Sequence, residues 1–304
     1  MRSARVLLTG IVDYAGLFPP ASLEMSDAVA LYASYVTGPE LDLLGRFVLP
    51  ATRLDEFAEV AGDRLPHGEN SEPWRLSAVL SAVPSAGATE ARERVLAFNC
   101  SHWNSSELGH ALCDAIEMPV ASRGEIEAAL ETFPVFFELF LEVPISADPE
   151  PLIAAMAGTR ARAKSRTGGV TENAIPATGD VLRFMKACHL HRVAFKATAG
   201  LHHAMRAEYP LTYEQESPRA EMLGYINVFL AAAFLAAGLT DDEIVKILEE
   251  RDATAFRFGD AGVSWRGRNL SVDQLDRTRR DFALSYGSCS FADPVAEAKE
   301  LGLI

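Results

Sequence analysis

The chain has 304 residues, of which 49% are hydrophobic and 23% charged, which is an ordinary composition for a globular protein. This length is too great for a minimal domain and fits one (β/α)8 barrel or two smaller domains. The net charge of −14 and the isoelectric point near 5.0 exclude a typical nonspecific nucleic-acid-binding protein.

The cysteines and the apolar runs indicate the compartment. None of the four cysteines forms a CxxC pair, which predicts a reducing environment and no zinc ribbon. The apolar run at the start of the chain is too short for a signal peptide. The most apolar run, Met222–Ala237, is interrupted by Gly224 and Asn227 and is too short to cross a bilayer. We therefore expect a soluble cytoplasmic protein with no membrane and no nucleic-acid partner.

In the first half of the chain, strand-like and helix-like patterns alternate. The expected strands are Val6–Tyr14, Gly45–Pro50, Leu76–Val83, Asp114–Val120 and Val135–Val143. The expected helices between and after them cover residues 28–35, 54–61, 89–96, 122–132 and 148–156. Polar, turn-rich segments connect these elements, and the segment Asn99–Glu107 looks irregular.

The stretch Arg160–His203 predicts a strand, a glycine-containing loop, a helix and a further strand. Apolar residues in the predicted helix recur at i, i+3, i+4 and i+7, and Asp180 suits the dipole of its first turn. After this unit come an apolar helix over Pro218–Gly238 and a short helix that begins at a capping box, Thr240-Asp-Asp-Glu243.

The eighth strand has two candidates, Ala255–Phe258, which we prefer, and Tyr286–Phe291. Residues 259–266 are expected to form a turn and hairpin, with helices over 272–284 and 294–301. Eight strands that alternate with helices predict a single (β/α)8 TIM barrel domain over residues 1–304. Residues 201–252 are expected to form a loop and helical insertion after strand seven. The hairpin and the last helices are additions at the C-terminal end.

The apolar helix within Met222–Ala237 is expected to be buried or to contact another subunit, because monomers rarely expose an apolar surface of that size. The sequence therefore allows a homo-oligomer.

A lysine lies near the carboxyl end of each strand in the central unit. Side chains alternate along a strand, so an inward-facing Lys164 takes Arg162 and Arg166 with it into the barrel. Buried cations need partners, and three glutamates on neighbouring strands could supply them: Glu117, Glu138 and Glu142. The alternative is that the Arg162, Lys164 and Arg166 side chains face outward. Lys196 favours the inward arrangement, because the rest of its strand is apolar or small.

Two lysines on adjacent barrel strands have a known chemical use. The ammonium of one lowers the pKa of the other, which leaves a neutral amine that can attack a carbonyl group and form a Schiff base. A carboxylate across the barrel can then move protons between the intermediates. This mechanism requires no metal ion and no organic cofactor.

The segment Lys164-Ser-Arg166-Thr167-Gly168-Gly-Val170, followed by Asn173-Ala-Ile-Pro176, resembles the strand-six motif of deoxyribose-phosphate aldolase. Three further segments are similar to motifs of that family: Phe195-Lys196-Ala-Thr-Ala-Gly200, Ile116-Glu117-Met118 and Phe140-Leu-Glu142. The resemblance covers strands four to seven. It implies a class I aldolase with Lys164 as the Schiff-base lysine, Lys196 as the neighbour that lowers its pKa, and Glu117 as the proton relay.

Departures from the family pattern lie around the phosphate site. Arg166 replaces a serine, Leu201-His202-His203 replaces a glycine, and Phe258-Gly-Asp260-Ala brings an anion where the family binds phosphate. Arg166 and His202 would suit a carboxylate or another small anion. We therefore expect a small carbonyl substrate that can be anionic, bound by Arg166, Thr167, Glu142, Arg46, His202 and Asp13.

The leading functional prediction is a class I aldolase-like lyase. One alternative is a Schiff-base dehydratase or isomerase that uses the same lysine. Another is a non-catalytic barrel that binds a small anion through Arg46, Arg166 and His202. The histidine pairs His202-His203 and His189/His191 are interpreted as packing or surface residues and not as metal ligands. Cys289 is interpreted as structural, because no activating base is evident beside it in the sequence.

Overall fold

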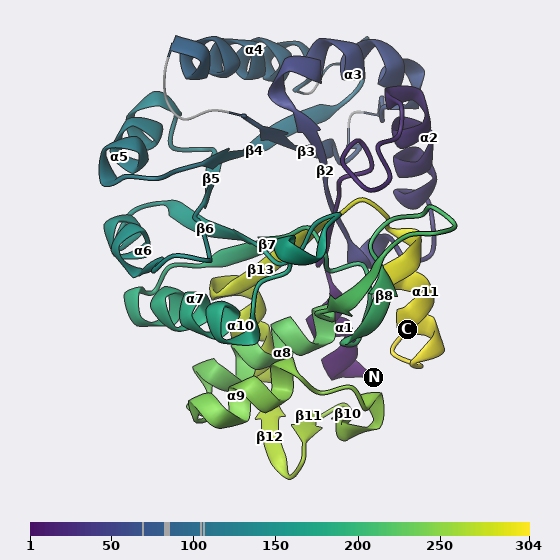
Figure 1. The fold of residues 1–304 in the computed structure, drawn as a ribbon. Coiled ribbons are helices and arrows are strands. Elements are labelled where there is room, and N and C mark those ends of the chain that lie inside the picture. Colours follow the sequence, from purple (N-terminus) through teal and green to yellow (C-terminus); the bar gives the residue numbers. More distant parts are fainter. Residues whose placement is uncertain (69, 82–85, 104, 106) are drawn as a thin grey trace.

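The computed structural model describes residues 1–304 except 69, 82–85, 104 and 106. Eight parallel strands close into a barrel in the order β1-β13-β7-β6-β5-β4-β3-β2 (Figure 1), which confirms the predicted (β/α)8 fold. The barrel strands are β1 (Val12–Tyr14), β2 (Leu44–Pro50), β3 (Trp74–Val79), β4 (Ala111–Pro119), β5 (Glu138–Glu142), β6 (Ala161–Arg166), β7 (Phe195–Thr198) and β13 (Ala283–Ser288).

Helices surround the barrel and cover its outer face (Figure 1). They are α1 (Arg2–Leu8), α2 (Met25–Tyr35), α3 (Leu54–Ala61), α4 (Ala86–His102), α5 (Arg123–Thr132), α6 (Glu150–Met156), α7 (Thr178–His191), α8 (Tyr225–Ala236), α9 (Asp241–Leu248), α10 (Val272–Asp281) and α11 (Ala292–Glu300). Local sequence sets several boundaries. The capping box predicted at Thr240 and Glu243 forms at the start of α9, and a second one joins Ser122 and Glu125 at the start of α5.

The prediction of a first strand over Val6–Tyr14 is wrong in its first part. Residues Arg2–Leu8 form helix α1, whose buried Ala4, Leu7 and Leu8 lie on one face at i, i+3 and i+4 spacing. The strand itself is limited to Val12–Tyr14, where all three residues are buried. Apolar residues at the start of the chain therefore pack α1 against α10 and do not extend the barrel.

The preferred eighth strand is also wrong, and the second candidate, Tyr286–Phe291, overlaps the observed strand only over residues 286–288. Residues Phe256–Phe258 form β10, which pairs antiparallel with β11 (Gly262–Trp265), and β11 pairs with β12 (Arg268–Ser271). The barrel is closed instead by β13, which is buried over almost its whole length and pairs with both β1 and β7. The short β10 alternates buried and exposed residues, as a strand at a surface does.

The insertion after β7 begins with strands β8 (Ala207–Pro210) and β9 (Arg219–Met222), which form an antiparallel pair. The helix predicted over Pro218–Gly238 therefore starts only at Tyr225. In α8 every residue from Tyr225 to Leu235 is buried, because the helix packs against α7, α9, α10 and β13 within this chain. Its apolar composition is thus explained by burial within the protein.

Two predicted segments differ from the structure around α4. The segment Asn99–Glu107 is helical up to His102, and its residues 104 and 106 lie outside the described residues. The third strand ends at Val79, and residues 82 and 83 of the predicted strand also lie outside them.

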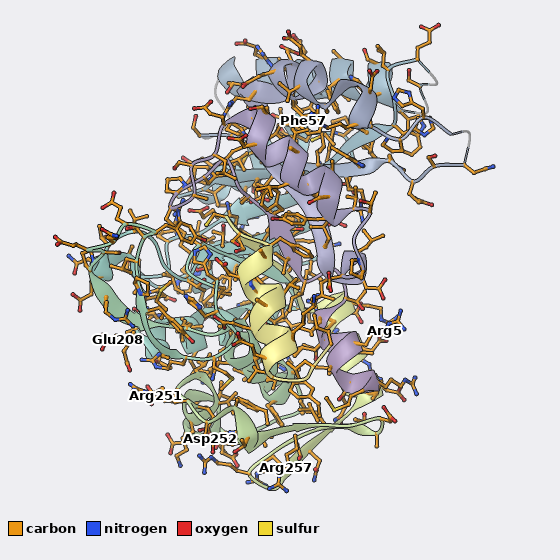
Figure 2. The ribbon with its side chains drawn as sticks, turned by 90° about the vertical axis from the view of Figure 1, so that its right-hand side faces the viewer. Arg5, Phe57, Glu208, Arg251, Asp252 and Arg257 are labelled. Carbon is orange, nitrogen blue, oxygen red and sulfur yellow. The ribbon has the colours of Figure 1, made fainter. Side chains whose placement is uncertain are left out.

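In the part of the chain that is described, no helix is long and apolar enough to cross a membrane. The segment with α9 and β10–β12 forms one end of the molecule in Figure 1. Arg251, Asp252 and Arg257 project outward there in Figure 2, and all three are exposed. Charges of both signs therefore lie close together at this end of the surface.

Candidate functional site

The register of three strands sets the centre of the candidate site. Lys164 on β6 lies opposite Glu142 on β5 and opposite Lys196 on β7. Side chains of directly opposed residues point to the same face of a sheet, and here that face is the barrel interior. The alternative in which the Lys164 side chain faces outward is excluded, because Lys164 and Lys196 are both buried and both contact Glu117 of β4.

These side chains form a continuous row of alternating charge, which we call the ion row: Asp13, Lys196, Glu117, Lys164, Glu142 and Arg166. Lys196 Nζ lies 2.5 Å from Asp13 Oδ2 and 2.7 Å from Glu117 Oε1. Lys164 Nζ lies 2.9 Å from Glu117 Oε2 and 2.8 Å from Glu142 Oε2. Arg166 Nε donates to Glu142 Oε1 at 3.0 Å. Three cations thus balance three carboxylates, which offsets the cost of burying them.

Exposure increases along the ion row toward the carboxyl ends of the strands. The side chains of Lys196 and Asp13 are almost completely buried, whereas 22% of the Glu142 side chain and 60% of the Arg166 side chain are exposed. The row therefore runs from the closed interior of the barrel to its open mouth, where (β/α)8 enzymes place their active sites.

The electrostatics of the row contradict the Schiff-base prediction. Burial alone would lower the pKa of Lys164, but the carboxylates of Glu117 and Glu142 raise it above its ordinary value. Burial would likewise raise the pKa of Glu117, but Lys196 and Lys164 hold it far below its usual range. Lys164 is therefore held as an ammonium ion and not as the neutral amine that would attack a carbonyl group.

A cavity of about 400 Å³ lies at the carboxyl ends of the strands. Its charged lining consists of the outer part of the ion row, Glu117, Glu142, Lys164, Arg166 and Lys196. Apolar side chains, among them Phe18, Val48 and Met118, make up much of the remaining wall. Mostly apolar walls with a few convergent polar groups are typical of small-molecule sites.

Thr167 lies next to Arg166 but is already engaged. Its hydroxyl donates to the carbonyl oxygen of Ala199 at 2.6 Å and joins the ends of β6 and β7. The backbones of these ends approach closely, because a Cβ atom on Gly168 would lie 2.7 Å from the Cα atom of Gly200. Thr167 thus shapes the mouth of the barrel beside the cavity.

Two other predicted substrate-binding residues lie away from this mouth. Arg46 is near the start of β2, where it pairs with Asp114 at 2.7 Å and with Glu138 at 3.5 Å. Asp13 lies at the inner end of the ion row and also accepts from Ser285 and from the backbone N–H of Arg46. The predicted anion site made of Arg46, Arg166 and His202 is therefore wrong, because Arg46 and Arg166 line separate cavities.

His202 lies beside Cys289 near the mouth, an arrangement that sequence reasoning missed. Its Nδ1 is 3.1 Å from Ser288 Oγ and 3.7 Å from the sulfur of Cys289, which lines the cavity. Burial lowers the pKa of His202 to about 4 and raises the pKa of the Cys289 thiol. At neutral pH both groups are therefore uncharged. Among the described residues, no His, Cys, Asp and Glu side chains gather into a group that could hold a metal ion.

Sequence reasoning also missed two serines that support the ion row. Ser77 on β3 donates to Glu117 Oε1 at 2.6 Å, and Ser285 on β13 donates to Asp13 Oδ2 at 2.8 Å. Both are buried hydroxyls on barrel strands. A serine within the apolar segment Leu76–Val79 was the available signal for Ser77, since a buried hydroxyl needs a partner.

Comparisons with known proteins give little further information. No protein-family model and no curated protein matches the chain. One solved structure that is similar is the Bacillus cereus spore cortex-lytic enzyme SleL, with 10% sequence identity and a TM-score of 0.42. The similarity covers 96% of this chain and 73% of that chain.

The predicted resemblance to deoxyribose-phosphate aldolase is therefore corrected. No family model and no curated protein supports the short motifs on which the resemblance rested, and the solved structure reported above is described as a cortex-lytic enzyme. The lyase and Schiff-base predictions fail with it, and the raised pKa of Lys164 gives the physical reason.

Proposed function

We propose that the chain is an enzyme that transfers a proton to and from a small anionic carbonyl compound in the cavity at the carboxyl ends of the strands. One observation carries the proposal. The Lys164 ammonium and the Glu142 carboxylate lie 2.8 Å apart and both line that cavity, with Arg166 beside them. An acid and a base that meet at a substrate-sized cavity are the basic equipment for proton transfer.

Lys164 would stabilise negative charge on the substrate. An ammonium group has three donors, and the carboxylates of Glu117 and Glu142 account for two of them. The third can donate to a carbonyl oxygen in the cavity. A cation that is already fixed in a largely buried place stabilises a developing oxyanion strongly, because it does not have to reorganise during the reaction.

Glu142 would act as the base. Its pKa, which burial would raise, is lowered by Lys164 and Arg166, so it is ionised at neutral pH. When Glu142 takes a proton from the carbon next to the carbonyl group, its negative charge disappears and one develops on the substrate oxygen. Both charges lie beside Lys164, so the ammonium exchanges one anionic partner for another.

Arg166 would bind the anionic group of the substrate. Its Nε is used by Glu142, but its side chain is largely exposed and its terminal nitrogens can form paired hydrogen bonds with a carboxylate. The volume of about 400 Å³ sets the size class of the substrate, since it is at the small end of the range for ligand cavities.

Solvent exchange tests this proposal without knowledge of the product. The protein is incubated in D₂O with a panel of small 2-oxo and 3-oxo carboxylates, and deuterium at the carbon next to the carbonyl group is followed by NMR. We expect catalysed exchange for at least one compound. The rate of catalysed exchange should fall by about a hundredfold or more in Glu142→Gln and in Lys164→Met, because general acid–base groups contribute effects of that order.

Glu127→Gln is the matched control, because Glu127 is an exposed glutamate on α5 that pairs only with Arg123 in the described structure. It should exchange deuterium as fast as the wild type. Exchange that survives in Glu142→Gln and Lys164→Met would show that these residues do not carry the reaction. Folding of each variant is checked by circular dichroism.

A further inference from the structure

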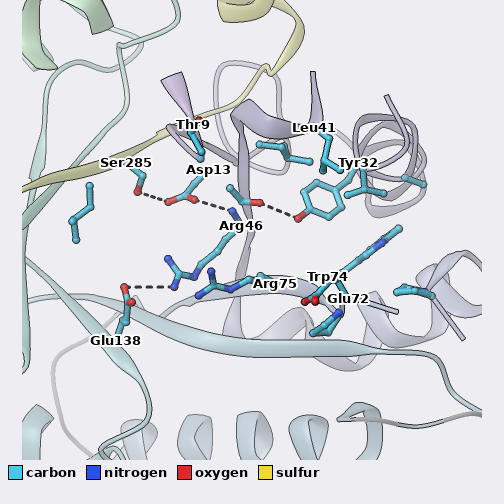
Figure 3. Close-up of a pocket in the computed structure, with 18 of the residues that line it drawn as sticks. Thr9, Asp13, Tyr32, Leu41, Arg46, Glu72, Trp74, Arg75, Glu138 and Ser285 are labelled. Carbon is cyan, nitrogen blue, oxygen red and sulfur yellow. Dashed lines mark hydrogen bonds and ion pairs between the residues drawn. The ribbon is translucent and has the colours of Figure 1, made fainter. Parts of the chain in front are cut away.

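A second and larger cavity lies at the opposite end of the barrel. It has a volume of about 710 Å³ and is formed by the amino-terminal ends of the barrel strands and by α2 (Figure 3). Arg46 and Arg75 enter it near the starts of β2 and β3, and Glu138 lies across from them at the start of β5. The function proposed above does not use this cavity.

The cavity is rich in arginine in a protein that is acidic as a whole. Six arginines line it: Arg46, Arg64, Arg75, Arg162, Arg279 and Arg280. The carboxylates that line it are Asp13, Glu72 and Glu138, and Asp114 lies behind them as the partner of Arg46 and Arg75. Asp276 in turn pairs with Arg280. Cations therefore exceed carboxylates by one when these partners are included, although the whole chain has a net charge of −14. A local excess of this sign attracts anions.

Arg279 is the most buried cation of the cavity that has no carboxylate partner in the described structure. Its guanidinium donates to the main-chain carbonyls of Leu7, Thr9, Ala283 and Leu284 and lies 5.0 Å from the ring centre of Phe229. Asp13, without contacting Arg279, is a carboxylate whose charge acts on it, and an anion in the adjoining cavity would offset more of the cost of burying this cation.

Arg162 and Arg75 leave donors for a ligand. Arg162 Nε is buried without a hydrogen-bond partner, and its nearest carboxylate oxygen, on Glu138, is 3.6 Å away. More than half of the Arg75 side chain is exposed, and it shares its one carboxylate, Asp114, with Arg46. Because Arg162 Nε is itself hidden, the donors open to a ligand are those of Arg75 and of the partly exposed end of the Arg162 side chain.

We propose that this amino-terminal cavity is a second binding site, which takes a small organic molecule with two or more phosphate or carboxylate groups. The guanidinium groups match both kinds of anion in paired geometry. Tyr32, Trp74 and Leu41 give the cavity an apolar wall for the body of such a molecule.

Calorimetric titration of the full chain with pyrophosphate and, separately, with citrate tests the proposal at constant ionic strength. We expect saturable one-to-one binding of at least one of them, with a change in the fluorescence of Trp74. Binding of pyrophosphate alone assigns phosphate groups, and binding of citrate alone assigns carboxylates. Arg75→Ala should weaken binding by about tenfold or more, because hydrogen bonds to charged groups contribute at that level.

Each of two control variants removes one arginine that lies outside this cavity. Arg123→Ala changes an exposed residue of α5, and Arg166→Ala changes the cavity at the carboxyl ends of the strands. Arg123→Ala should bind both compounds as the wild type does. Arg166→Ala should leave pyrophosphate binding unchanged, and it is not used as a control for citrate, because Arg166 is proposed above to bind a carboxylate. The proposal is overturned if neither compound binds, or if all three variants weaken binding equally, which would mean general charge attraction only. Loss of binding in Arg166→Ala alone would place the anion in the other cavity and also overturn it.

Discussion

Replacing Glu117 by glutamine should lower the free energy of unfolding by about 3 kcal/mol or more, because breaking a buried ion pair leaves charge without compensation. Glu117 is the only carboxylate of the ion row that contacts both lysines. Its loss leaves a net positive charge inside the barrel and turns an amide toward two ammonium groups. The measurement is equilibrium unfolding in urea at neutral pH, with the midpoint and slope fitted together.

Glu127→Gln is the control for this substitution as well. It makes the same chemical change at an exposed i, i+4 pair with Arg123, where we expect a loss of less than about 0.5 kcal/mol. A Glu117→Gln protein that unfolds with the stability of Glu127→Gln would contradict the account, because the ion row would then contribute nothing as a buried network.

Replacing Lys196 should also cause a large loss of stability, and this loss should be strongly coupled to the loss caused by replacing Glu117. Lys196→Met removes the lysine partner of Asp13 and one of the two lysine partners of Glu117. We expect the single variant to lose about 3 kcal/mol or more. The double variant Glu117→Gln/Lys196→Met removes one charge of each sign. It should therefore be more stable than the sum of the two single losses predicts, by about 2 kcal/mol.

A double-mutant cycle in urea measures this coupling directly. The reference cycle pairs Lys196→Met with Glu127→Gln, two residues that share no contact among the described interactions, and its losses should add. Additive losses in the Glu117 cycle would show that the two buried charges do not stabilise each other.

The sequence was sufficient for most of the fold. The alternation of strand-like and helix-like periods predicted the barrel, and α3 was predicted with its observed bounds. The errors arose where the local sequence fits two kinds of structure and tertiary packing selects one of them. Leu7 and Leu8 fit a strand or a helix face equally well, and only the contact with α10 selects the helix. The same holds for Phe256–Phe258, whose partners lie in a small separate sheet.

The sequence predicted most of the side chains that form the candidate site, but not how their charges change the pKa of Lys164. The apolar surroundings of Lys196 correctly indicated that it faces inward. The predicted direction of the Lys164 pKa shift is wrong, because the carboxylates of Glu117 and Glu142 together raise its pKa more than burial lowers it. Those carboxylates come from β4 and β5, and Asp13 lies 183 positions before Lys196 in the chain. Such long-range pairs are fixed by the closing of the barrel and not by local sequence.

The lysine content of the chain gives further weight to the ion row. The sequence has only five lysines against 23 arginines, and two of these five are buried in the barrel. Lysine is a compact charge on a flexible stem, whereas arginine is a broad planar group, so the two are not interchangeable in a confined space. The narrow interior between Asp13, Glu117 and Glu142 accommodates the compact ammonium.

The most direct test of the central claim is the pH titration of Lys164, followed by NMR in protein labelled at the lysine ε-carbon. Only five signals are expected, and Lys164→Met assigns one of them. The exposed Lys186, Lys246 and Lys299 serve as internal references. Because its pKa is raised above the ordinary lysine value of 10.5, Lys164 should remain an ammonium ion at pH 10.5.

The same titration has a consequence for stability. A lysine whose pKa is raised in the folded state stabilises the fold fully below its unfolded pKa, near 10.5, and that contribution is lost as the pH rises through the folded value. Our account predicts that Lys164 titrates above the ordinary lysine value of 10.5. A Lys164 that loses its proton below that value would contradict it, because a neutral amine could not stabilise the negative charge that develops on the substrate oxygen in the proposed site.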